Sequence, residues 1–508
     1  MGRIGRRRFL QAMAAAAAGV TVAGRIPGAR GAEPIAVPPG AAGALGRLAG
    51  AMQGDLLLPG DADWTALNTT SNARWLPVVP LAIARCADAA DVQAALAWAR
   101  AEGVPFAIRG GGHHYMGGST SPGLVISTIA MKGTRYDPET GLLIAGAGVQ
   151  NQDLAVVQSQ DGAGRFILPG GTCPTVGLGG LTLGGGIGPN ARWAGLTADH
   201  LIATEIVTAD GELLTVDAER HPDLFWALRG GAGGSFGVNT SFTYRLAPIP
   251  GPEALVFGLE TSSRDRVLQT ILTALDALAD APHGFSVILM AYSDAEHGVA
   301  MEGYGQITDP DDPEQLARVD AILGLDHDET ARLRLPFWEA QAWNMGGVTP
   351  PNAYWDRARF ATGAVDPAAI AEAVDALTRF PGLTDERYGE LVTYGWVGGA
   401  VGAVARDATA WVHRDATALF RVSAVWPRTP EVPGEVSPIP ADAAAWSEAT
   451  WDALIPALAN ESYQNFPDPG LIDWATAYHA ENLPRLRAVK GRYDPEDVFR
   501  AAQSVPLP

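Results

Sequence analysis

The sequence predicts an α+β protein whose first part and middle part differ in texture. In the first part short strands alternate with short helices: residues 88–100 carry apolar side chains at helical spacing behind an aspartate cap, and residues 105–108 form a short strand. In the middle part longer helices alternate with strand candidates, as in 264–279 followed by 285–292. The proline-rich segment 248–252 separates the two parts and is the predicted domain boundary.

The remaining elements follow from the same patterns. Apolar runs between turn residues predict strands, and a tight turn joins two of them into a hairpin. The further strands of the first part are expected at 124–129, 142–145, 201–208 and 213–216. The middle part is expected to contain a further helix at 367–380 and a further strand at 390–396.

The composition excludes several classes of protein. The 508 residues are too many for one ordinary core, and 47% hydrophobic with 18% charged residues is typical of globular proteins. A formal net charge of −20 argues against nucleic acid or an anionic membrane as a partner. Only Cys86 and Cys173 are present, so a disulfide framework is not expected, and Cys86 is expected to be a small core residue.

The N-terminus is predicted to be an export signal. Residues 5–11, GRRRFLQ, resemble the twin-arginine pattern, and the apolar run 10–24 that follows is too short for a membrane span. We expect a signal peptide over residues 1–32, secretion or export to the periplasm, and no membrane anchor after its removal. Twin-arginine export carries folded proteins and therefore suits a chain whose cofactor is loaded before export. The alternative is a basic amphipathic helix of the mature protein.

Three glycine-rich loops indicate a large bound ligand. They are RGGGHHY at 109–115, the stretch from 170 to 188 around GTCPTVGLGG, and LRGGAGGSFG at 228–237. We expect them at strand ends, with backbone amides directed at phosphates and a flat ring system. None has the GxGxxG spacing and no GxxxxGK[ST] occurs, so a Rossmann nicotinamide site and a P-loop are both disfavoured.

These loops resemble those of the berberine-bridge-enzyme-like oxidases, within the vanillyl-alcohol-oxidase type of FAD proteins. The resemblance covers about residues 75–506, and its motifs occur in the family's order: RGGGHHY, GTCPTVGLGG, GLTAD at 195–199, DLFWALRGGAGGSFG ending at 237, and YDP…QSVP at 493–506. It implies a PCMH-type FAD-binding domain in two parts, 56–250 and 463–508. It also implies a substrate domain over 251–462 with an antiparallel sheet backed by helices, and an active site in the crevice between the domains.

The resemblance assigns roles to particular residues. The positions that bond the flavin covalently in the family are His113 and Cys173, and Val176, three after the cysteine, is typical of oxidases. Taken alone, His113 would be a turn or capping residue and Cys173 an inert buried thiol. The further positions expected to contact FAD are Arg109, Gly110, Gly111, Gly112, His114, Gly117, Gly171, Gly177, Gly179, Gly180, Gly186, Gly237 and Val238. No metal is expected in the site.

The catalytic base is where this chain departs from the family pattern. Many relatives carry a tyrosine, with a pKa lowered by its surroundings, in a Y-x-N-Y-x-D segment; residues 463–468 read YQNFPD, which places Phe466 there. Phenylalanine cannot accept a proton. We therefore expect Tyr394 to be the base, with Tyr463 as the second candidate. His413 is expected to be structural.

The predicted function is a secreted FAD-dependent oxidase. It would take hydride from an alcohol or hemiacetal carbon of a carbohydrate or glycosylated natural product, and O₂ would reoxidise the flavin to give H₂O₂. Trp338, Trp343, Tyr354 and Trp355 are expected either to stack on such a substrate or to pack in the core. Two alternatives stay open: a serine hydrolase using GGSFG at 233–237, and a flavin- or carbohydrate-binding protein without turnover.

Overall fold

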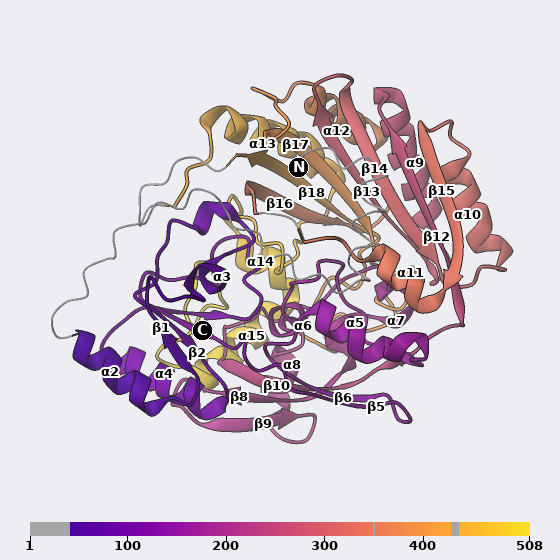
Figure 1. Ribbon diagram of the computed structural model, residues 1–508. Coiled ribbons are helices and arrows are strands. Elements are labelled where there is room, and N and C mark those ends of the chain that lie inside the picture. Colours follow the sequence, from indigo (N-terminus) through magenta and orange to yellow (C-terminus); the bar gives the residue numbers. More distant parts are fainter. Residues whose placement is uncertain (1–40, 349–350, 428–435) are drawn as a thin grey trace.

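The computed structural model describes residues 41–348, 351–427 and 436–508 (Figure 1). The predicted signal peptide, residues 1–32, lies outside the described residues. None of the helices within these ranges is long and apolar enough to cross a membrane. The described residues build three main β-sheets, two from the first part of the chain and one from the middle part.

The first sheet has four strands in the order β1-β2-β4-β3. β2 (Ala82–Arg85) and β3 (Phe106–Arg109) both run parallel to the central strand β4 (Leu124–Ser127), while β1 (Asp55–Leu57) is antiparallel. The parallel pairing requires a crossover between β2 and β3, which α4 (Ala89–Ala101) supplies. α4 begins as predicted, because the Asp88 carboxylate caps it by accepting a hydrogen bond from Asp91 N at 3.0 Å.

The second sheet has five antiparallel strands in the order β5-β6-β10-β8-β9. Alternating burial along the central strand β10 gives this sheet a face that packs in the core. The five strands are β5 (Thr134–Asp137), β6 (Leu142–Gly146), β8 (Leu201–Val207), β9 (Leu213–Asp217) and β10 (Val238–Arg245). The helices of this region are α5 (Asn151–Ser159), α6 (Leu178–Leu183), α7 (Ala191–Ala194) and α8 (Pro222–Ala227).

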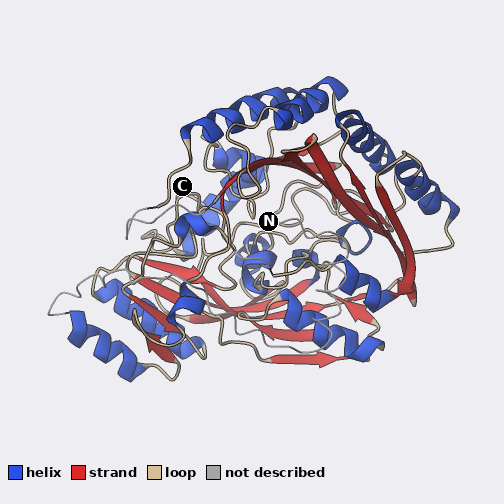
Figure 2. Ribbon diagram, turned by 45° about the horizontal axis from the view of Figure 1, so that its top comes forward, coloured by secondary structure: helices blue, strands red, loops and turns tan. Residues whose placement is uncertain are grey.

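The third sheet has seven antiparallel strands in the order β15-β12-β14-β13-β17-β18-β16. Figure 2 shows it as a strongly curved layer with helices along its outer face and the rest of the chain on its inner side. Its strands are β12 (Glu253–Thr261), β13 (Phe285–Asp294), β14 (Gly298–Ile307), β15 (Glu329–Pro336), β16 (Ala353–Ala361), β17 (Tyr388–Gly395) and β18 (Ala418–Trp426). The outer helices are α9 (Arg264–Leu278), α10 (Pro313–Leu323), α12 (Pro367–Thr378) and α13 (Ala441–Leu454).

The C-terminal segment returns to the first part of the chain. α15 (Leu483–Tyr493) contacts α8, and Lys490 Nζ, which is fully buried, donates to Ser235 O at 2.9 Å and pairs with Asp494 at 2.6 Å. Phe499 packs in the core of the four-stranded sheet. The remaining short elements are α2 (Ala41–Ala51), α3 (Trp64–Asn68), β7 (Phe166–Ile167), β11 (Ala247–Pro248), α11 (Phe337–Asn344), α14 (Trp474–His479) and single 3₁₀ turns.

The structure confirms the helices and strands expected from the sequence, with small shifts at their ends. The third glycine-rich loop adjoins a strand only at its own C-terminal end. The third glycine-rich loop, 228–237, does not follow a strand; it follows α8 and leads into β10. The aromatic and leucine side chains just before this loop form a buried helical turn, as Leu224, Phe225 and Trp226 are all buried.

Candidate active site

A cavity of about 4140 Å³ lies between the glycine-rich loops and the inner face of the seven-stranded sheet. Its lining includes residues of all three loops on one side and residues of β12, β13, β14, β17 and β18 on the other. A space of this size holds a dinucleotide cofactor and a substrate together. The wall opposite the loops is part of the sheet from the middle part of the chain.

The first two glycine-rich loops touch each other directly. His113 Nε2 lies 2.8 Å from Thr175 Oγ1, which joins the RGGGHHY loop to the GTCPTVG loop. A Cβ on Gly111 would lie 2.4 Å from Gly177 N, and a Cβ on Gly177 would lie 2.5 Å from Gly111 N. These two glycines are therefore required by the contact between the loops, and not only by room for a ligand.

The first loop offers unpaired backbone donors to the cavity. Within the described part of the chain, the N–H groups of residues 110–114 have no hydrogen-bond acceptor. Buried or partly buried backbone amides normally find an acceptor, so this row of donors indicates a polar ligand such as a flavin ring or a pyrophosphate. Gly110, Gly171 and Gly180 also leave room, because a Cβ on any of them would meet no atom closer than 3.7 Å. The residues present therefore fit an FAD.

His113 and Cys173 both line the cavity, and their side chains are accessible from it. Burial lowers the pKa of His113 to about 4, so its imidazole is neutral at pH 7. Burial raises the pKa of the Cys173 thiol, while the positive charge of Arg421 acts in the opposite direction. The other cysteine, Cys86, is fully buried in the core of the first sheet, as expected.

Most of the residues expected to contact FAD line the cavity, and four do not. Arg109 is buried and donates to the carbonyl oxygens of Ser119 and Leu67. The position of Gly117 is fixed by the Trp75 ring, and that of Gly186 by Thr197. Val238 is buried in β10 opposite Val207. The residues that do line the cavity are Gly110, Gly111, Gly112, His113, His114, Gly171, Cys173, Val176, Gly177, Gly179, Gly180 and Gly237.

The two predicted base candidates differ in what their hydroxyl groups contact. Tyr463 Oη accepts hydrogen bonds from Gly186 N at 3.0 Å and Ile187 N at 3.3 Å, and Asn465 Nδ2 lies 3.2 Å away. Tyr394 is on β17 and lines the cavity, and its hydroxyl has no hydrogen-bond partner among the described residues. Burial raises the pKa of Tyr394 well above its ordinary value and also raises that of Tyr463. The expectation of a tyrosine with a lowered pKa is therefore not met by either.

Phe466 stands at the centre of a group of aromatic rings in the cavity wall. The Tyr115 ring stacks on it at 5.1 Å and 14°, and the Tyr394 ring lies 5.5 Å away at 52°. In place of the tyrosine that the family resemblance leads us to expect, this position thus has a ring that packs between two other tyrosines. Tyr394, which is expected to act as the base because position 466 is a phenylalanine, therefore lies next to the Phe466 ring.

Sequence reasoning missed the charged group beside these rings. Arg421 on β18 lies over the Tyr394 ring, with its guanidinium carbon 5.8 Å from the ring centroid. Its Nη2 is 2.7 Å from Glu390 Oε2, and its Nη1 is 3.6 Å from Asp356 Oδ2. The alternation of β16, β17 and β18 would have placed these side chains on one face of a sheet, but the pairing of the strands could not be read from the sequence.

The four aromatic residues singled out from the sequence divide between the cavity and the core. Trp338, Trp343 and Tyr354 line the cavity, and Trp343 contacts Tyr304 edge to face at 6.0 Å. Trp355 does not line it; the side chain packs with Trp426 and lies under the guanidinium of Arg74 at 5.2 Å. Neighbouring residues of β16 point to opposite faces, which separates Tyr354 from Trp355.

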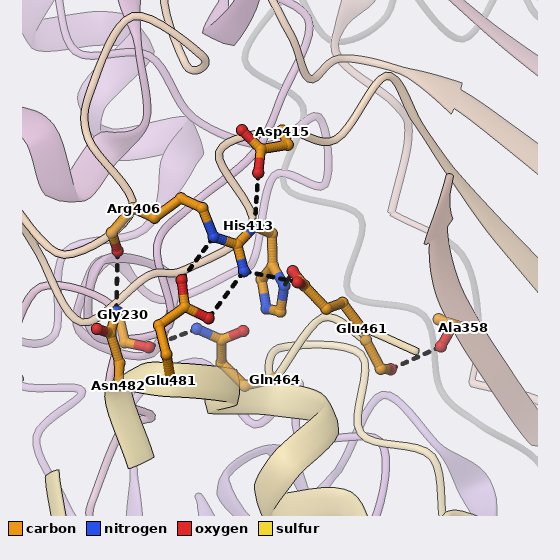
Figure 3. A network of polar contacts seen from close by, with 10 residues as sticks. Gly230, Ala358, Arg406, His413, Asp415, Glu461, Gln464, Glu481 and Asn482 are labelled. Atoms are coloured by element: carbon orange, nitrogen blue, oxygen red, sulfur yellow. Dashed lines mark hydrogen bonds and ion pairs between the residues drawn. The ribbon is translucent and has the colours of Figure 1, made fainter. Parts of the chain in front are cut away.

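A polar network that is buried at His413 and Gln464 holds the segment that carries Tyr463 and Phe466 (Figure 3). His413 Nδ1 lies 2.7 Å from Glu461 Oε2, and Arg406 donates to Glu461 at 2.7 Å and to Glu481 at 2.6 Å. Gln464 Nε2 donates to the Gly230 carbonyl. His413 is fully buried in this network, which agrees with the structural role predicted for it.

The serine-hydrolase alternative is wrong. Ser235 is 1% exposed, and its Oγ accepts a hydrogen bond from Val505 N at 3.3 Å. The residues that follow GGSFG form strand β10, whereas a nucleophile elbow leads into a helix. Ser235 is a packing and hydrogen-bonding residue under the C-terminal segment.

Comparisons with known proteins agree with this geometry. Residues 80–217 match the family described as FAD binding domain, and residues 462–506 match the family described as berberine and berberine like. An uncharacterized FAD-linked oxidoreductase of Bacillus subtilis, YgaK, is 32% identical over 90% of this chain and 97% of its own length.

Solved structures share the fold. The xylooligosaccharide oxidase from Myceliophthora thermophila C1 in complex with xylobiose is 22% identical, with a TM-score of 0.77 over 92% of this chain and 99% of its own. Glucooligosaccharide oxidase from Acremonium strictum, which carries a 6-S-cysteinyl, 8α-N1-histidyl FAD, is 23% identical, with a TM-score of 0.77 over 91% of this chain and 98% of its own. The sequence matches show that the chain belongs to the berberine-bridge-enzyme-like family of FAD-linked oxidoreductases.

Proposed function

We propose that this protein is an oxidase that takes hydride from an alcohol or hemiacetal carbon of a carbohydrate or glycosylated natural product. One observation carries the proposal: His113 and Cys173 project from two contacting loops into the cavity, and the sheet wall opposite them carries Tyr394 and Arg421. The chemistry that FAD supplies in such a site is hydride acceptance followed by reoxidation by O₂, with release of H₂O₂. Val176 beside the cysteine supports oxygen as the acceptor.

We further propose that FAD is bound covalently through both His113 and Cys173. The His113 side chain supports a particular atom for its bond: Nε2 faces Thr175 Oγ1 at 2.8 Å, whereas Nδ1 has no hydrogen-bond partner among the described residues. If Nε2 donates to Thr175, the free lone pair is on Nδ1, and the neutral imidazole is in the tautomer that a nucleophile needs. Cys173 faces the same cavity from the second loop.

The parts of the chain on the two sides of the cavity are proposed to bind different molecules. We propose that residues 56–250 and 463–508 form the FAD-binding domain and that 251–462 form the substrate domain. The return of α15 and Phe499 to the first part of the chain supports this division. Of the two predicted tyrosines, we propose Tyr394 as the one that contacts the substrate oxygen, because the Tyr463 hydroxyl is occupied by backbone N–H donors.

The N-terminal pattern supports export. We propose that residues 1–32 direct the protein through the twin-arginine route, since a chain that loads FAD before export needs a route for folded proteins. Expression in cells with and without a functional twin-arginine system tests this. The mature protein should reach the periplasm or medium only when the system is present, and Arg6→Lys with Arg7→Lys should retain it in the cytoplasm.

The experiment that tests the function is a peroxide assay. Purified holoprotein is mixed with xylobiose, cellobiose, primary alcohols and glycosylated polyketides, and H₂O₂ release is followed together with anaerobic bleaching of the flavin. Release of H₂O₂ with any of these substrates supports the proposal. A yellow protein whose flavin none of them bleaches would favour a binding protein without turnover.

A further inference from the structure

The cavity wall contains a buried carboxylate with an oxygen that no protein group satisfies. Asp356 on β16 is 4% exposed and lines the cavity. Its Oδ1 has no hydrogen-bond partner in the described part of the chain, and its Oδ2 faces Arg421 Nη1 at 3.6 Å. Buried acceptors are nearly always paired, so this oxygen indicates a donor that belongs to a ligand.

The position of Asp356 is set by the sheet. Asp356 and Ser423 are direct partners on β16 and β18, and Ser423 is in turn opposite Glu390 on β17. All three line the cavity, so this row of side chains points toward the glycine-rich loops. Arg421 is two residues from Ser423 on the same face, and its charge is felt by the Cys173 thiol across the cavity.

Arg421 divides its contacts unequally between its two carboxylate neighbours. The distance to Glu390 is 2.7 Å, a full ion pair, while the distance to Asp356 is 3.6 Å and leaves one oxygen free. Glu390 is therefore committed to Arg421. Asp356 keeps a lone pair available beside a cation that stabilises its charge.

We propose that Asp356 is the proton acceptor of the reaction, in place of the tyrosine that relatives carry at the position of Phe466. The inference rests on the proposed function. In the step, the O–H bond of the substrate breaks and its proton goes to Asp356 Oδ1. The electron pair of that bond forms the C=O bond while the C–H hydride leaves for the bound oxidised flavin. Tyr394 remains a hydrogen-bond donor to the substrate oxygen.

The electrostatics favour the carboxylate over the tyrosine at neutral pH. Burial raises the pKa of Asp356 to about 6, against the effects of Arg421 and of the nearby Ser423 hydroxyl, whereas burial raises the pKa of Tyr394 well above its ordinary value. A base is most effective when its pKa lies near the working pH. The titratable or charged groups around Asp356 are Arg421, Glu390, Tyr388, Tyr354, Tyr394, Tyr115 and Asp468.

The test is the pH dependence of anaerobic flavin reduction in stopped flow, with a substrate identified by the peroxide assay. In the wild type the rate of flavin reduction should rise with pH in a single limb near pH 6. Asp356→Asn should lose that limb and reduce the flavin at least 100-fold more slowly at pH 7.5, while Asp356→Glu should recover part of the rate and keep a limb. Tyr394→Phe should keep the limb near pH 6 with a smaller loss of rate.

A second readout needs no substrate. A carboxylate with a raised pKa in the folded state destabilises the fold once it ionises, so Asp356→Asn should raise the unfolding midpoint at pH 8 and not at pH 4. Asp452→Asn, at an exposed position of α13, is the control and should not change the midpoint in this pH-dependent way.

The possible outcomes separate the two proposals. If Asp356→Asn keeps the wild-type limb and rate while Tyr394→Phe abolishes them, Asp356 is not the proton acceptor and the tyrosine is. If no substrate of the panel reduces the wild-type flavin, the proposed function is wrong. The inference about Asp356 then also fails if Asp356→Asn has the same effect on unfolding at pH 4 and pH 8.

Discussion

His113 Nε2 lies 2.8 Å from Thr175 Oγ1, so the side chain proposed to anchor the flavin from the first loop is held by the loop that carries Cys173. This contact fixes the position of the imidazole, and if Nε2 is the donor it leaves the lone pair on Nδ1. We expect Thr175→Val to impair the bond at His113. In a Cys173→Ala background, Thr175→Val should leave little flavin attached after acid precipitation, while Thr175→Ser should keep it. If Thr175→Val and Thr175→Ser keep equal amounts of flavin attached, the hydrogen bond is not required.

Double attachment predicts a characteristic pattern among variants. The wild type should keep its yellow colour after acid precipitation, and so should Cys173→Ala and His113→Ala. Only the double variant should release FAD, although the glycine loops can still hold it in the native fold. Absorbance of the supernatant measures the release. A wild type that loses all its flavin to acid would refute the covalent proposal.

The contact between Gly111 and Gly177 predicts a difference between glycines of the same loops. Gly111→Ala places a Cβ 2.4 Å from backbone atoms of the other loop, so it should lower the free energy of unfolding by about 1–3 kcal/mol and weaken flavin binding. A Cβ on Gly180 would meet no protein atom within 4 Å. Gly180→Ala is the control: it should leave the stability of the apoprotein unchanged, and urea unfolding measures both variants.

Tyr394 and Tyr463 should respond differently to loss of the hydroxyl. Tyr463→Phe leaves the N–H groups of Gly186 and Ile187 without their acceptor, which should cost about 1–3 kcal/mol of stability. Tyr394→Phe removes no hydrogen bond within the described ranges, so its main effect should be on flavin reduction. Thermal unfolding and stopped-flow reduction, measured on both variants, check this. Equal kinetic losses with equal stability losses would contradict it.

The network around Glu461 should make stability sensitive to acid. Burial alone would raise the pKa of Glu461, but the hydrogen bonds and charges of His413 and Arg406 outweigh it and lower the pKa to about 2. A depressed carboxylate pKa stabilises the fold above its unfolded value of 4.5, and this stability is lost as the pH falls toward 2. The lowered pKa of Glu461 contributes about 3 kcal/mol to the free energy of unfolding at pH 7.

Glu461→Gln tests this expectation. Between pH 7 and pH 3 the wild type should lose about 2–3 kcal/mol more unfolding free energy than the variant, measured by urea unfolding at each pH. Glu481→Gln changes a more exposed partner of Arg406 and should give a smaller difference. A wild type and a Glu461→Gln variant with parallel pH dependence would show that the network holds no such energy.

The sequence by itself determined the elements, the order of the motifs and the two residues proposed to attach the flavin. Helical and alternating periodicities are local properties, so the helix at 88–100 and the strand at 390–396 could be recognised as α4 and β17 without knowledge of the fold. The family resemblance pointed to His113 and Cys173 as the residues that bond the flavin. The structure places both in the lining of one cavity. The replacement of the usual tyrosine by Phe466 was also visible, and with it the question of the base.

Only the tertiary structure shows which charged groups lie near Phe466 and why particular glycines are needed. Arg421, Glu390 and Asp356 come together because β16, β17 and β18 pair in one register, and register is fixed by packing across a sheet rather than by local sequence. Gly111 and Gly177 are needed because two distant loops cross backbone against backbone. Asp356 likewise keeps an oxygen without a hydrogen-bond partner among the described residues, because Arg421 forms its short ion pair with Glu390 instead.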